Sequence, residues 1–453
     1  MQLPRILIGA PSSGSGKTLI TCGILQLLKN GGKKVISFKC GPDYIDPMFH
    51  SRVIGMKSRN LDSFFTDRQT LRGLMRRNGK GSDLAVVEGV MGYYDGLAGI
   101  SSRASAWDVA DQTDTPAVLL VNCKGMSVSA VPFIKGFLEY KEDSHIKGVI
   151  FNQLSPMMYP RMKQMVEEAL PVKAYGYVPL VKDCHLESRH LGLVMPDEIA
   201  DLQENLNRLA EILKDSLDVT GLLDLAKSAP PIVEELPAEP PVCGRPLRIG
   251  LAKDEAFCFF YEDNLTLLEE MGAKLIPFSP IHDKALPEDL DGLLLHGGYP
   301  ELYAKELSAN ASMRCSIKKT IEEGLPCIAE CGGFMYLHDR MQGHDEAYYD
   351  MAGVISGTVH KTQRLTRFGY ITLSQGCAFG QQVGTMPSHE FHYYDSENCG
   401  EEFLASKPLS KRSWRCIHSS GTLFAGYPHI YYYGNRKMPR AFLEKCRERK
   451  DKK

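Results

Sequence analysis

The sequence predicts two α/β domains, each a doubly wound sheet with helices on its faces, joined by an irregular linker. Apolar runs typical of buried strands alternate with helical patterns through the first half of the chain, and the alternation restarts after residue 246. Residues 229–246 lie between, are rich in Pro and Glu, and cannot hold a regular element. We therefore expect one domain at 1–228, a semi-rigid linker at 229–246 and a second domain at 247–453.

The expected elements of the first domain follow in strand–helix order. Its first strand, residues 5–10, leads through a Gly/Ser loop into a helix at residues 19–29. Later strands are expected at the apolar runs 34–38, 84–87, 117–121 and 147–151. Continuous apolar runs of this kind are typical of a parallel sheet that is buried on both faces. In the second domain we expect strands at 248–252, 291–295 and 327–329.

Composition excludes several classes of protein. The chain has 453 residues, more than one ordinary core accommodates, and its 43% hydrophobic and 24% charged content is typical of a globular protein. A net charge of -2 gives no basic field that would attract nucleic acid. We find no signal-peptide pattern and no apolar run long enough to span a bilayer. The 13 cysteines include no CxxC pair, so we expect a reduced, cytoplasmic protein that does not contact membranes.

The loop after the first strand carries a phosphate-binding pattern. Residues 10–18 have the sequence APSSGSGKT, and a predicted helix follows. Small residues let backbone N–H groups close around phosphate oxygens, and the helix N-terminus favours negative charge. We expect Lys17 to reach the outer phosphates of ATP and the Thr18 hydroxyl to bind Mg²⁺, with the loop itself formed by Ser13, Gly14, Ser15 and Gly16. Pro11 replaces the first glycine of the strict pattern, so a plain Gly/Ser turn is the alternative.

Carboxylates follow two of the expected strands at their C-terminal ends. Asp43 and Asp46 lie in the segment KCGPDYIDP after the second strand, and Glu88 directly follows the run 84–87. Ligands of open α/β sheets bind at this edge, and Mg²⁺ held with ATP needs only one or two protein carboxylates. Burial of Glu88 without a partner would be costly. For Asp43, Asp46 and the later Asp95, ordinary turn roles are the alternative.

The second domain carries a candidate thiol nucleophile. Cys331 lies directly after an expected strand and before two glycines, in the sequence IAECGG. A sharp strand-to-helix turn would expose its side chain, and the helix N-terminus would lower the pKa of the thiol. Backbone N–H groups at Gly298 and Gly332 could form an oxyanion hole, and His429 is the candidate base. The alternative is that Cys331 simply packs in the core.

Together these residues match a known family. The chain resembles the cobyrinic acid a,c-diamide synthase family, the two-domain corrin amidases, over essentially its whole length. Its first half is similar to dethiobiotin synthetase, a P-loop NTPase-like fold, and its second half is similar to class I glutamine amidotransferases. The motifs that carry the resemblance are residues 10–18, 39–50 (KCGPDYIDPMFH), 88–96 (EGVMGYYDG), 189–193 (RHLGL), 297–301 (GGYPE), 330–333 (ECGG) and 389–392 (HEFH).

The resemblance implies a glutamine-dependent ligase. ATP would phosphorylate a peripheral carboxylate of the macrocycle, Cys331 would release ammonia from glutamine, and ammonia would displace phosphate to leave amides at side chains a and c. By analogy with the dethiobiotin synthetase half, Asp43 and Glu88 would join Thr18 around Mg²⁺. Asn152 would contact the base of ATP, with a loop-capping role as the alternative. Substrate-facing residues would be Tyr44, Asp46 and Asp95. Expected partners are corrinoid, glutamine and ATP, with a homodimer as a possible assembly.

Two departures and several alternatives remain open. Class I glutaminases often carry a glutamate two residues after the catalytic histidine, where this chain has Tyr431; the corrin amidases similarly lack it. Tyr93 replaces a more usual aliphatic residue. The same chemistry on nickel-sirohydrochlorin or hydrogenobyrinic acid is an alternative. So, from another class, is a regulatory P-loop ATPase fused to an inactive glutaminase-like domain.

Overall fold

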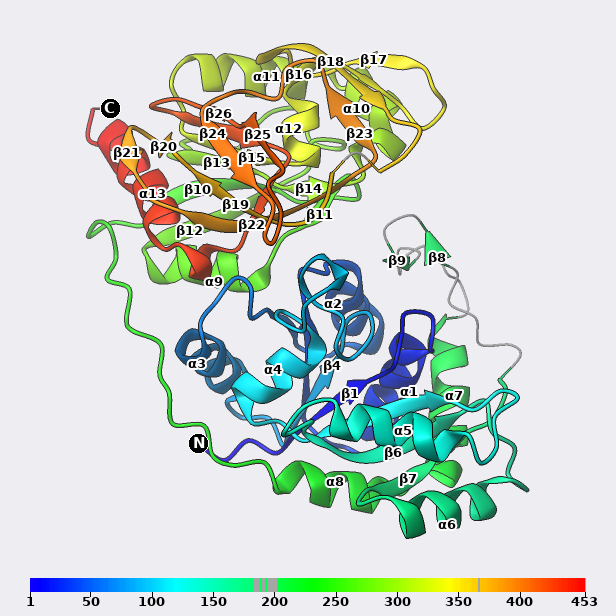
Figure 1. Cartoon of the computed structure of the whole chain (residues 1–453). Coiled ribbons are helices and arrows are strands. Elements are labelled where there is room, and N and C mark those ends of the chain that lie inside the picture. The colour runs from blue at the N-terminus through cyan, green and yellow to red at the C-terminus, as the bar shows by residue number, and fades with distance from the viewer. Residues whose placement is uncertain (182–187, 190–191, 194–201, 366, 453) are drawn as a thin grey trace. The chain divides into compact units, whose positions relative to one another are not determined.

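The chain folds into two compact units. The computed structural model describes residues 1–452 apart from 182–187, 190–191, 194–201 and 366. The units are Met1–Pro237 and Ala238–Lys453, and the division between them falls within the segment 229–246 (Figure 1). The motif at 189–193 lies partly outside the described residues. Each unit is described by itself below.

One parallel sheet organises the first unit. Its strand order is β3-β2-β4-β1-β5-β6-β7, and every neighbouring pair runs parallel. The strands are β1 (Arg5–Gly9), β2 (Val35–Cys40), β3 (Ser58–Leu61), β4 (Leu84–Glu88), β5 (Ala117–Asn122), β6 (Ile146–Asn152) and β7 (Lys173–Val178). All residues of β1, β2 and β4 are buried, as the continuous apolar runs predict. A separate antiparallel pair joins β8 (Ser188–Arg189) and β9 (Gly192–Leu193).

Helices cover this sheet and supply its core. They are α1 (Lys17–Asn30), α2 (Ile45–Phe49), α3 (Arg68–Gly79), α4 (Ala106–Thr113), α5 (Ala130–Glu139), α6 (Tyr159–Ala169), α7 (Leu202–Ser216) and α8 (Val219–Lys227), with a π-helical turn η1 (His50–Ile54) and a 3-10 turn η2 (Leu97–Gly99). Gly23 of α1 packs against α7, because an added Cβ would lie 2.7 Å from Leu213 and 2.8 Å from Leu209. Close helix packing on the P-loop side therefore depends on a residue without a side chain.

The second unit has a second mostly parallel sheet. Its strand order is β12-β10-β13-β15-β27-β26, with only β26 antiparallel to its neighbour. The strands are β10 (Leu247–Ala252), β12 (Ala273–Phe278), β13 (Gly292–Leu295), β15 (Cys327–Glu330), β26 (His418–Ser419) and β27 (Leu423–Gly426). The helices are α9 (Glu262–Glu270), α10 (Ala304–Ala309), α11 (Ala311–Glu322), α12 (Gly332–Tyr336) and α13 (Lys437–Lys450), with 3-10 turns η4 (Pro300–Tyr303) and η5 (Tyr432–Gly434).

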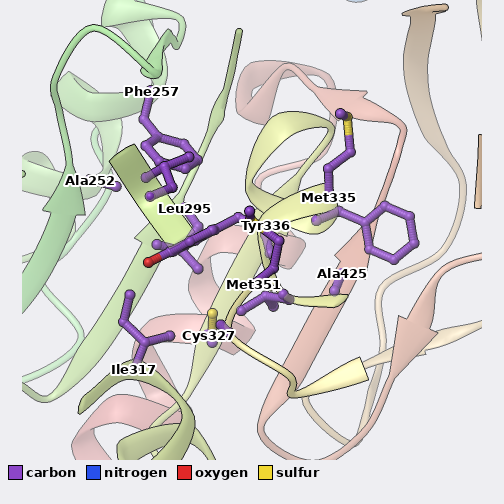
Figure 2. Close-up of a cluster of buried hydrophobic side chains, with 14 of the residues drawn as sticks. Ala252, Phe257, Leu295, Ile317, Cys327, Met335, Tyr336, Met351 and Ala425 are labelled. Carbon is purple, nitrogen blue, oxygen red and sulfur yellow. The ribbon is translucent and has the colours of Figure 1, made fainter. Parts of the chain in front are cut away.

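Strand residues and helix residues share the core of this unit. Figure 2 shows Leu295 of β13 and Cys327 of β15 beside Tyr336 of α12 and Ile317 of α11. All four are fully buried or nearly so. Because Cys331 belongs to the same cluster of buried residues, its backbone is set in packed surroundings. Among the described residues, no helix combines the length and the apolar character needed to cross a membrane.

Further strands of the second unit, antiparallel to their neighbours except for the parallel pair β16 and β18, were not predicted from the sequence. One sheet is ordered β17-β16-β18-β23 and another β25-β24-β19-β22-β28. Their strands are β16 (His338–Gln342), β17 (Tyr348–Asp350), β18 (Ile355–Lys361), β19 (Arg367–Ser374), β22 (Met386–His392), β23 (Tyr394–Ser396), β24 (Phe403–Ser406), β25 (Ser413–Cys416) and β28 (His429–Ile430); two short pairs are β11 (Phe257–Phe259) with β14 (Gly297–Gly298) and β20 (Cys377–Ala378) with β21 (Gln381–Gln382). These strands are mostly half-buried, so they lack the continuous apolar runs that marked the parallel sheets.

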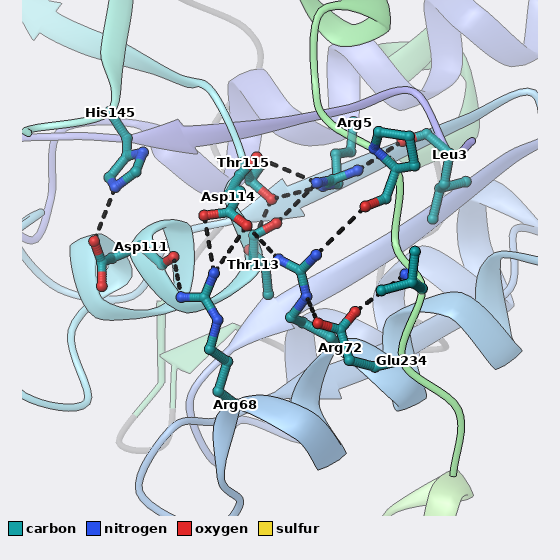
Figure 3. A network of polar contacts seen from close by, with 12 residues as sticks. Leu3, Arg5, Arg68, Arg72, Asp111, Thr113, Asp114, Thr115, His145 and Glu234 are labelled. Atoms are coloured by element: carbon teal, nitrogen blue, oxygen red, sulfur yellow. Dashed lines mark hydrogen bonds and ion pairs between the residues drawn. The ribbon is translucent and has the colours of Figure 1, made fainter. Parts of the chain in front are cut away.

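The segment 229–246 contains no helix or strand, but it is held at both ends. In the first unit, the Arg72 guanidinium contacts Glu234 at 2.7 Å and also Asp114, as Figure 3 shows. The Met1 carbonyl accepts a hydrogen bond from the backbone N–H of Ile232. In the second unit, Glu239 pairs with two arginines of the α13 region, Arg436 at 3.1 Å and Arg440 at 2.8 Å.

Candidate active site

The P-loop joins β1 to α1 and closes around its own lysine. The Lys17 ammonium donates to the carbonyls of Ser12 at 3.0 Å and Met91 at 2.5 Å. Gly14 and Gly16 have φ values of +73° and +87°, in the left-handed region that glycine adopts without strain. Burial lowers the pKa of Lys17 to about 8, and the nearby Lys39 charge acts in the same direction. A phosphate would oppose both effects, so this ammonium is suited to an anionic ligand.

A group of buried carboxylates lies beside Thr18. The Thr18 hydroxyl donates to Glu88 at 2.7 Å and lies 3.4 Å from the Asp46 carboxylate. The Lys39 ammonium lies 2.8 Å from Glu88 and also contacts Asp46. The second Glu88 oxygen lies 3.2 Å from the Nε2 atom of His50. The ends of β2 and β4 therefore bring these groups together at the edge of the sheet where the P-loop begins.

The charge states of this group follow from its contacts. Burial alone would raise the pKa of Glu88, but the Lys39 ammonium and the His50 imidazole lower it well below its usual range. Burial raises the pKa of Asp46 well above its usual range, and the Asp43 and Glu88 charges add to this rise. Glu88 is therefore the ionised carboxylate of the site, while Asp46 depends on nearby positive charge to ionise.

Two carboxylates expected at the site hold turns instead. Asp43 accepts hydrogen bonds from the backbone N–H groups of Ile45 at 2.8 Å and Asp46 at 3.1 Å. Asp95 accepts one from the N–H of Gly92 at 3.0 Å. Asp46 is thus the carboxylate that lies beside both Thr18 and Glu88, while metal binding by Asp43 stays a prediction. Tyr44 immediately precedes α2 on the same loop.

Asn152 lies against the P-loop rather than opening toward a ligand. Its amide nitrogen donates to the Ser15 carbonyl at 2.9 Å, and its amide oxygen accepts from the N–H of Gln153 at 2.9 Å. An added Cβ at Gly16 would lie 2.9 Å from the same amide nitrogen. These contacts favour the loop-holding alternative over an adenine-reading role.

The oxygens beside Thr18 fit a hard divalent cation. Mg²⁺ in nucleotide sites takes one or two carboxylates and completes its shell with water and phosphate oxygens. The Thr18 hydroxyl has the carboxylates of Glu88 and Asp46 within hydrogen-bonding reach. No group of three His, Cys, Asp or Glu side chains poised for a metal occurs in the part of the chain that the structure describes. A cation here would therefore depend on Thr18 and on the nucleotide.

In the second unit, Cys331 occupies a strained turn between β15 and α12. Its φ is +47° and its ψ is -104°, a backbone conformation that a non-glycine residue adopts at a cost of about 1–3 kcal/mol. The turn is fixed by the Cys331 N–H, which donates to the Gly426 carbonyl at 2.8 Å, and by the Met335 N–H, which donates to the Cys331 carbonyl at 2.8 Å. This is the strand–turn–helix context of a nucleophile elbow.

The glycines of the neighbouring loop leave room around Cys331. An added Cβ at Gly297 would lie 2.6 Å from the His429 ring and 3.6 Å from the Cβ of Cys331, so this glycine separates the two side chains. An added Cβ at Gly332 would lie 3.1 Å from the backbone nitrogen of Gly298. The structure thus brings Gly298, Gly332, Cys331 and His429 together, as the sequence motifs predict.

The ionisation of Cys331 and His429 points to proton transfer between them. Burial raises the pKa of the Cys331 thiol well above its usual range, and the charges of Glu301 and Glu390 act in the same direction. The backbone N–H of Gly332, at the start of α12, lowers the pKa as expected, but burial outweighs it. Burial lowers the pKa of His429 well below its usual range, with His389 and His296 adding to it. Both shifts favour the neutral forms, a protonated thiol and a neutral imidazole.

Three residues of the site had no predicted role. Glu330, His296 and His389 all lie within motifs that were identified, at positions next to the predicted residues or in the HEFH segment. Glu330 lies 3.8 Å from both His296 and His429. The signal was their position at the ends of β13 and β15 and within β22, but sequence alone does not show which strands converge.

Comparison with known proteins covers both units. A model of the CobQ/CobB/MinD/ParA nucleotide binding domain matches residues 6–194, and one of the CobB/CobQ-like glutamine amidotransferase domain matches 248–437. A cobyrinate a,c-diamide synthase of Caldanaerobacter subterraneus subsp. tengcongensis is 36% identical over 97% of this chain and 98% of the relative. The chain belongs to the cobyrinate a,c-diamide synthase family. The synthases of Listeria innocua (38%; 95% of this chain, 97% of the relative) and Priestia megaterium (33%; 99% and 98%) are similar.

Membership of the cobyrinate a,c-diamide synthase family confirms the resemblance drawn from the motifs. It also confirms the predicted pairing of a P-loop nucleotide-binding fold with a glutamine amidotransferase fold. Both families of fold are mostly parallel α/β sheets, as the two units are.

Proposed function

We propose that this chain converts the a and c carboxylates of cobyrinic acid, or of a closely related corrinoid, to amides, consuming ATP and taking nitrogen from glutamine. The observation that carries this proposal is the pairing of two sites in one chain of this family. One is a P-loop with Thr18 against the buried Glu88, and the other is an elbow cysteine beside His429. The first suits phosphoryl transfer and the second suits amide hydrolysis.

Glutamine is hydrolysed in the second unit. Neutral His429 accepts the thiol proton as Cys331 attacks the side-chain carbonyl carbon of glutamine. The resulting oxyanion is held by the backbone N–H groups of Gly298 and Gly332, each contributing roughly 3 kcal/mol to transition-state stabilisation. The imidazolium then returns the proton to the departing nitrogen, which leaves as ammonia. Water hydrolyses the thioester to glutamate and regenerates the thiol.

The carboxylate is activated in the first unit. A carboxylate at neutral pH is a poor electrophile, so transfer of the γ-phosphoryl group of ATP supplies a leaving group. Lys17 and the N–H groups of the P-loop bind the phosphates. Mg²⁺ bound by Thr18, Glu88 and Asp46 would neutralise charge on the transferring phosphoryl group. Ammonia attacks the acyl phosphate, an amide forms, and phosphate leaves.

Amide counting by mass spectrometry tests the function. The protein is incubated with ATP, Mg²⁺, glutamine and cobyrinic acid, and the product should gain two amides. Hydrogenobyrinic acid and nickel-sirohydrochlorin in parallel reactions identify the preferred macrocycle. ATP hydrolysis without any amide on these substrates would instead support a regulatory ATPase.

Ammonium replaces glutamine in the decisive control. Cys331→Ala should lose glutamine-driven amidation and keep amidation driven by high ammonium, because the ATP site is untouched. Cys315→Ala, an exposed cysteine, serves as the matched control and should retain both activities. Normal use of glutamine by Cys331→Ala would place the nucleophile elsewhere.

A further inference from the structure

Class I glutaminases often carry a glutamate two residues after the catalytic histidine, and this chain has Tyr431 at that position. Tyr431 lies two residues after His429, and its hydroxyl donates to the Asp263 carboxylate at 3.0 Å. Its ring packs edge-on against Tyr261 with ring centroids 5.1 Å apart. Tyr431 is thus committed to α9 and its N-terminal flank, and it offers no negative charge. The orienting group for His429 must come from another element.

A buried carboxylate faces His429 from the end of β15. The Oε2 atom of Glu330 lies 3.8 Å from the Nδ1 atom of His429, and both side chains are only 3% exposed. The same oxygen lies 3.8 Å from the Nδ1 atom of His296. One carboxylate is therefore shared by two buried imidazoles, and it belongs to the residue directly before Cys331.

The position of the His429 ring relative to Cys331 follows from the loop at Gly297. The Cε1 atom of His429, between the two ring nitrogens, lies over Gly297, where an added Cβ would be 2.6 Å from it and 3.6 Å from the Cβ of Cys331. With Nδ1 toward Glu330, the Nε2 atom is left on the other side of Cε1. A proton on Nδ1 and a lone pair on Nε2 form the tautomer that a base needs.

We propose that Glu330 is the positioning carboxylate of His429, filling the role that Tyr431 cannot. It holds the imidazole with its proton on Nδ1 and stabilises the imidazolium that forms when Nε2 takes the thiol proton. The proposal rests on the assignment of Cys331 and His429 as nucleophile and base. A separation of 3.8 Å suits an ion pair, and hydrogen bonds of this kind are often long in free enzymes and shorten with substrate bound.

Other charged and titratable groups surround His429 without replacing Glu330. His389 of β22 stacks on the ring with centroids 4.9 Å apart, and His296 and His392 lie close enough to lower the pKa of His429. All three are imidazoles and oppose a positive charge on His429. Burial raises the pKa of Glu330 above its usual value, and the His296 imidazole, 3.8 Å from the carboxylate, acts in the opposite direction.

The test compares Glu330→Gln with Tyr431→Phe in the full-length enzyme. Glu330→Gln should lower kcat for glutamine hydrolysis about 100-fold with little change in KM, because Glu330 does not touch glutamine. The acidic limb of the pH profile of kcat/KM should move to lower pH, because loss of the negative charge destabilises the imidazolium. Tyr431→Phe should leave that limb in place. Ammonium-driven amidation should be normal in both variants.

A conservative variant separates charge from folding. Glu330→Asp keeps the charge at a longer reach, so it should lower kcat yet hold the acidic limb at its wild-type pH, and thermal unfolding reports whether each variant is folded. The proposal would be overturned if Glu330→Gln kept a near-normal kcat and an unchanged acidic limb of the pH profile. It would also be overturned if the acidic limb moved as far in Glu330→Asp as in Glu330→Gln. Glutamine use by Cys331→Ala, in contrast, would overturn the underlying assignment of the nucleophile.

Discussion

His389 lies directly opposite His429 across the β22–β28 ladder, and their rings stack with 19° between their planes. Both imidazoles are almost completely buried, at 4% and 2% exposure. Burial lowers the pKa of His389 to about 3, and the Lys407 charge acts in the same direction. A stacked pair of neutral histidines has a measurable consequence for stability in acid.

We predict that His389→Phe weakens the acid sensitivity of the fold. The folded pKa lies below the unfolded value of about 6.5, so the contribution of His389 is complete above that pH and is lost progressively as pH falls toward about 3. Between pH 6.5 and 5 this loss is roughly 1–2 kcal/mol. Urea unfolding at several pH values across that range measures this, and the free energy of unfolding should fall less steeply with decreasing pH in His389→Phe than in the wild type. His282→Ala, which removes an exposed histidine, is the control, and an equally shallow slope there would contradict the prediction.

We predict that Lys17→Ala abolishes ATP-driven amidation with either glutamine or ammonium as nitrogen source. Its ammonium is the group that the P-loop carbonyls hold in place for phosphate. Glutamine hydrolysis should stay within about threefold of normal, because its residues lie in the other unit. Lys80→Ala, an exposed lysine of the same unit, should change neither activity. Equal loss of both activities in Lys17→Ala would contradict two separate sites.

We predict that the magnesium requirement depends on Asp46 and Glu88 and not on Asp43. Glu88→Gln and Asp46→Asn each replace a charged carboxylate beside Thr18 with a neutral amide, so the Mg²⁺ concentration for half-saturation should rise at least about tenfold. Asp43→Asn keeps an oxygen that accepts the two backbone hydrogen bonds of its turn, so its half-saturation should be unchanged. Titration of amidation rate against Mg²⁺ measures all three. A rise in Asp43→Asn and Glu88→Gln but not in Asp46→Asn would instead support the assignment made from the sequence.

We predict that Arg72→Met destabilises the first unit far more than Arg76→Met does. Both arginines of α3 contact the segment 229–237, but the Arg72 side chain is 6% exposed and bridges Asp114 and Glu234 (Figure 3). Loss of Arg72 removes the arginine partner of Glu234 and leaves Asp114 with Arg68 alone, which should cost about 2 kcal/mol. The Arg76 pair with Glu235 is exposed and should cost less than about 1 kcal/mol. Calorimetric unfolding compares them, and similar losses would argue against a bridging role.

The sequence predicted those elements that leave a strong local signal. Eight parallel strands were found because burial on both faces demands continuous apolar runs, and their observed bounds differ by one or two residues, as in β2 (Val35–Cys40) against 34–38. The parallel strands β3, β7, β12 and β27 were not predicted. The antiparallel strands of the second unit were missed, because half-buried strands such as β19 (Arg367–Ser374) carry polar residues at alternate positions.

The candidate site was predicted in its motifs but not in its pairings. Cys331, His429 and the two glycines were chosen from local context, and the fold brings them together. Which of Asp43 and Asp46 lies beside Thr18 depends on the path of the short loop that carries both. The two residues are only three positions apart, and the sequence does not determine that path. Glu330 acquires its place only because β15 and β28 end near each other, which is a long-range property of the fold.

The contacts of the segment 229–246 also bear on how the chain could be divided. Glu234 is bound within the first unit and Glu239 within the second, with the unit boundary between Pro237 and Ala238. A cut at that peptide bond would leave each half with the flank that stabilises it. What the cut removes is the high local concentration that a covalent tether gives the two halves. Two separately translated polypeptides could therefore carry the same pair of chemistries, with ammonia delivery then governed by how tightly they associate.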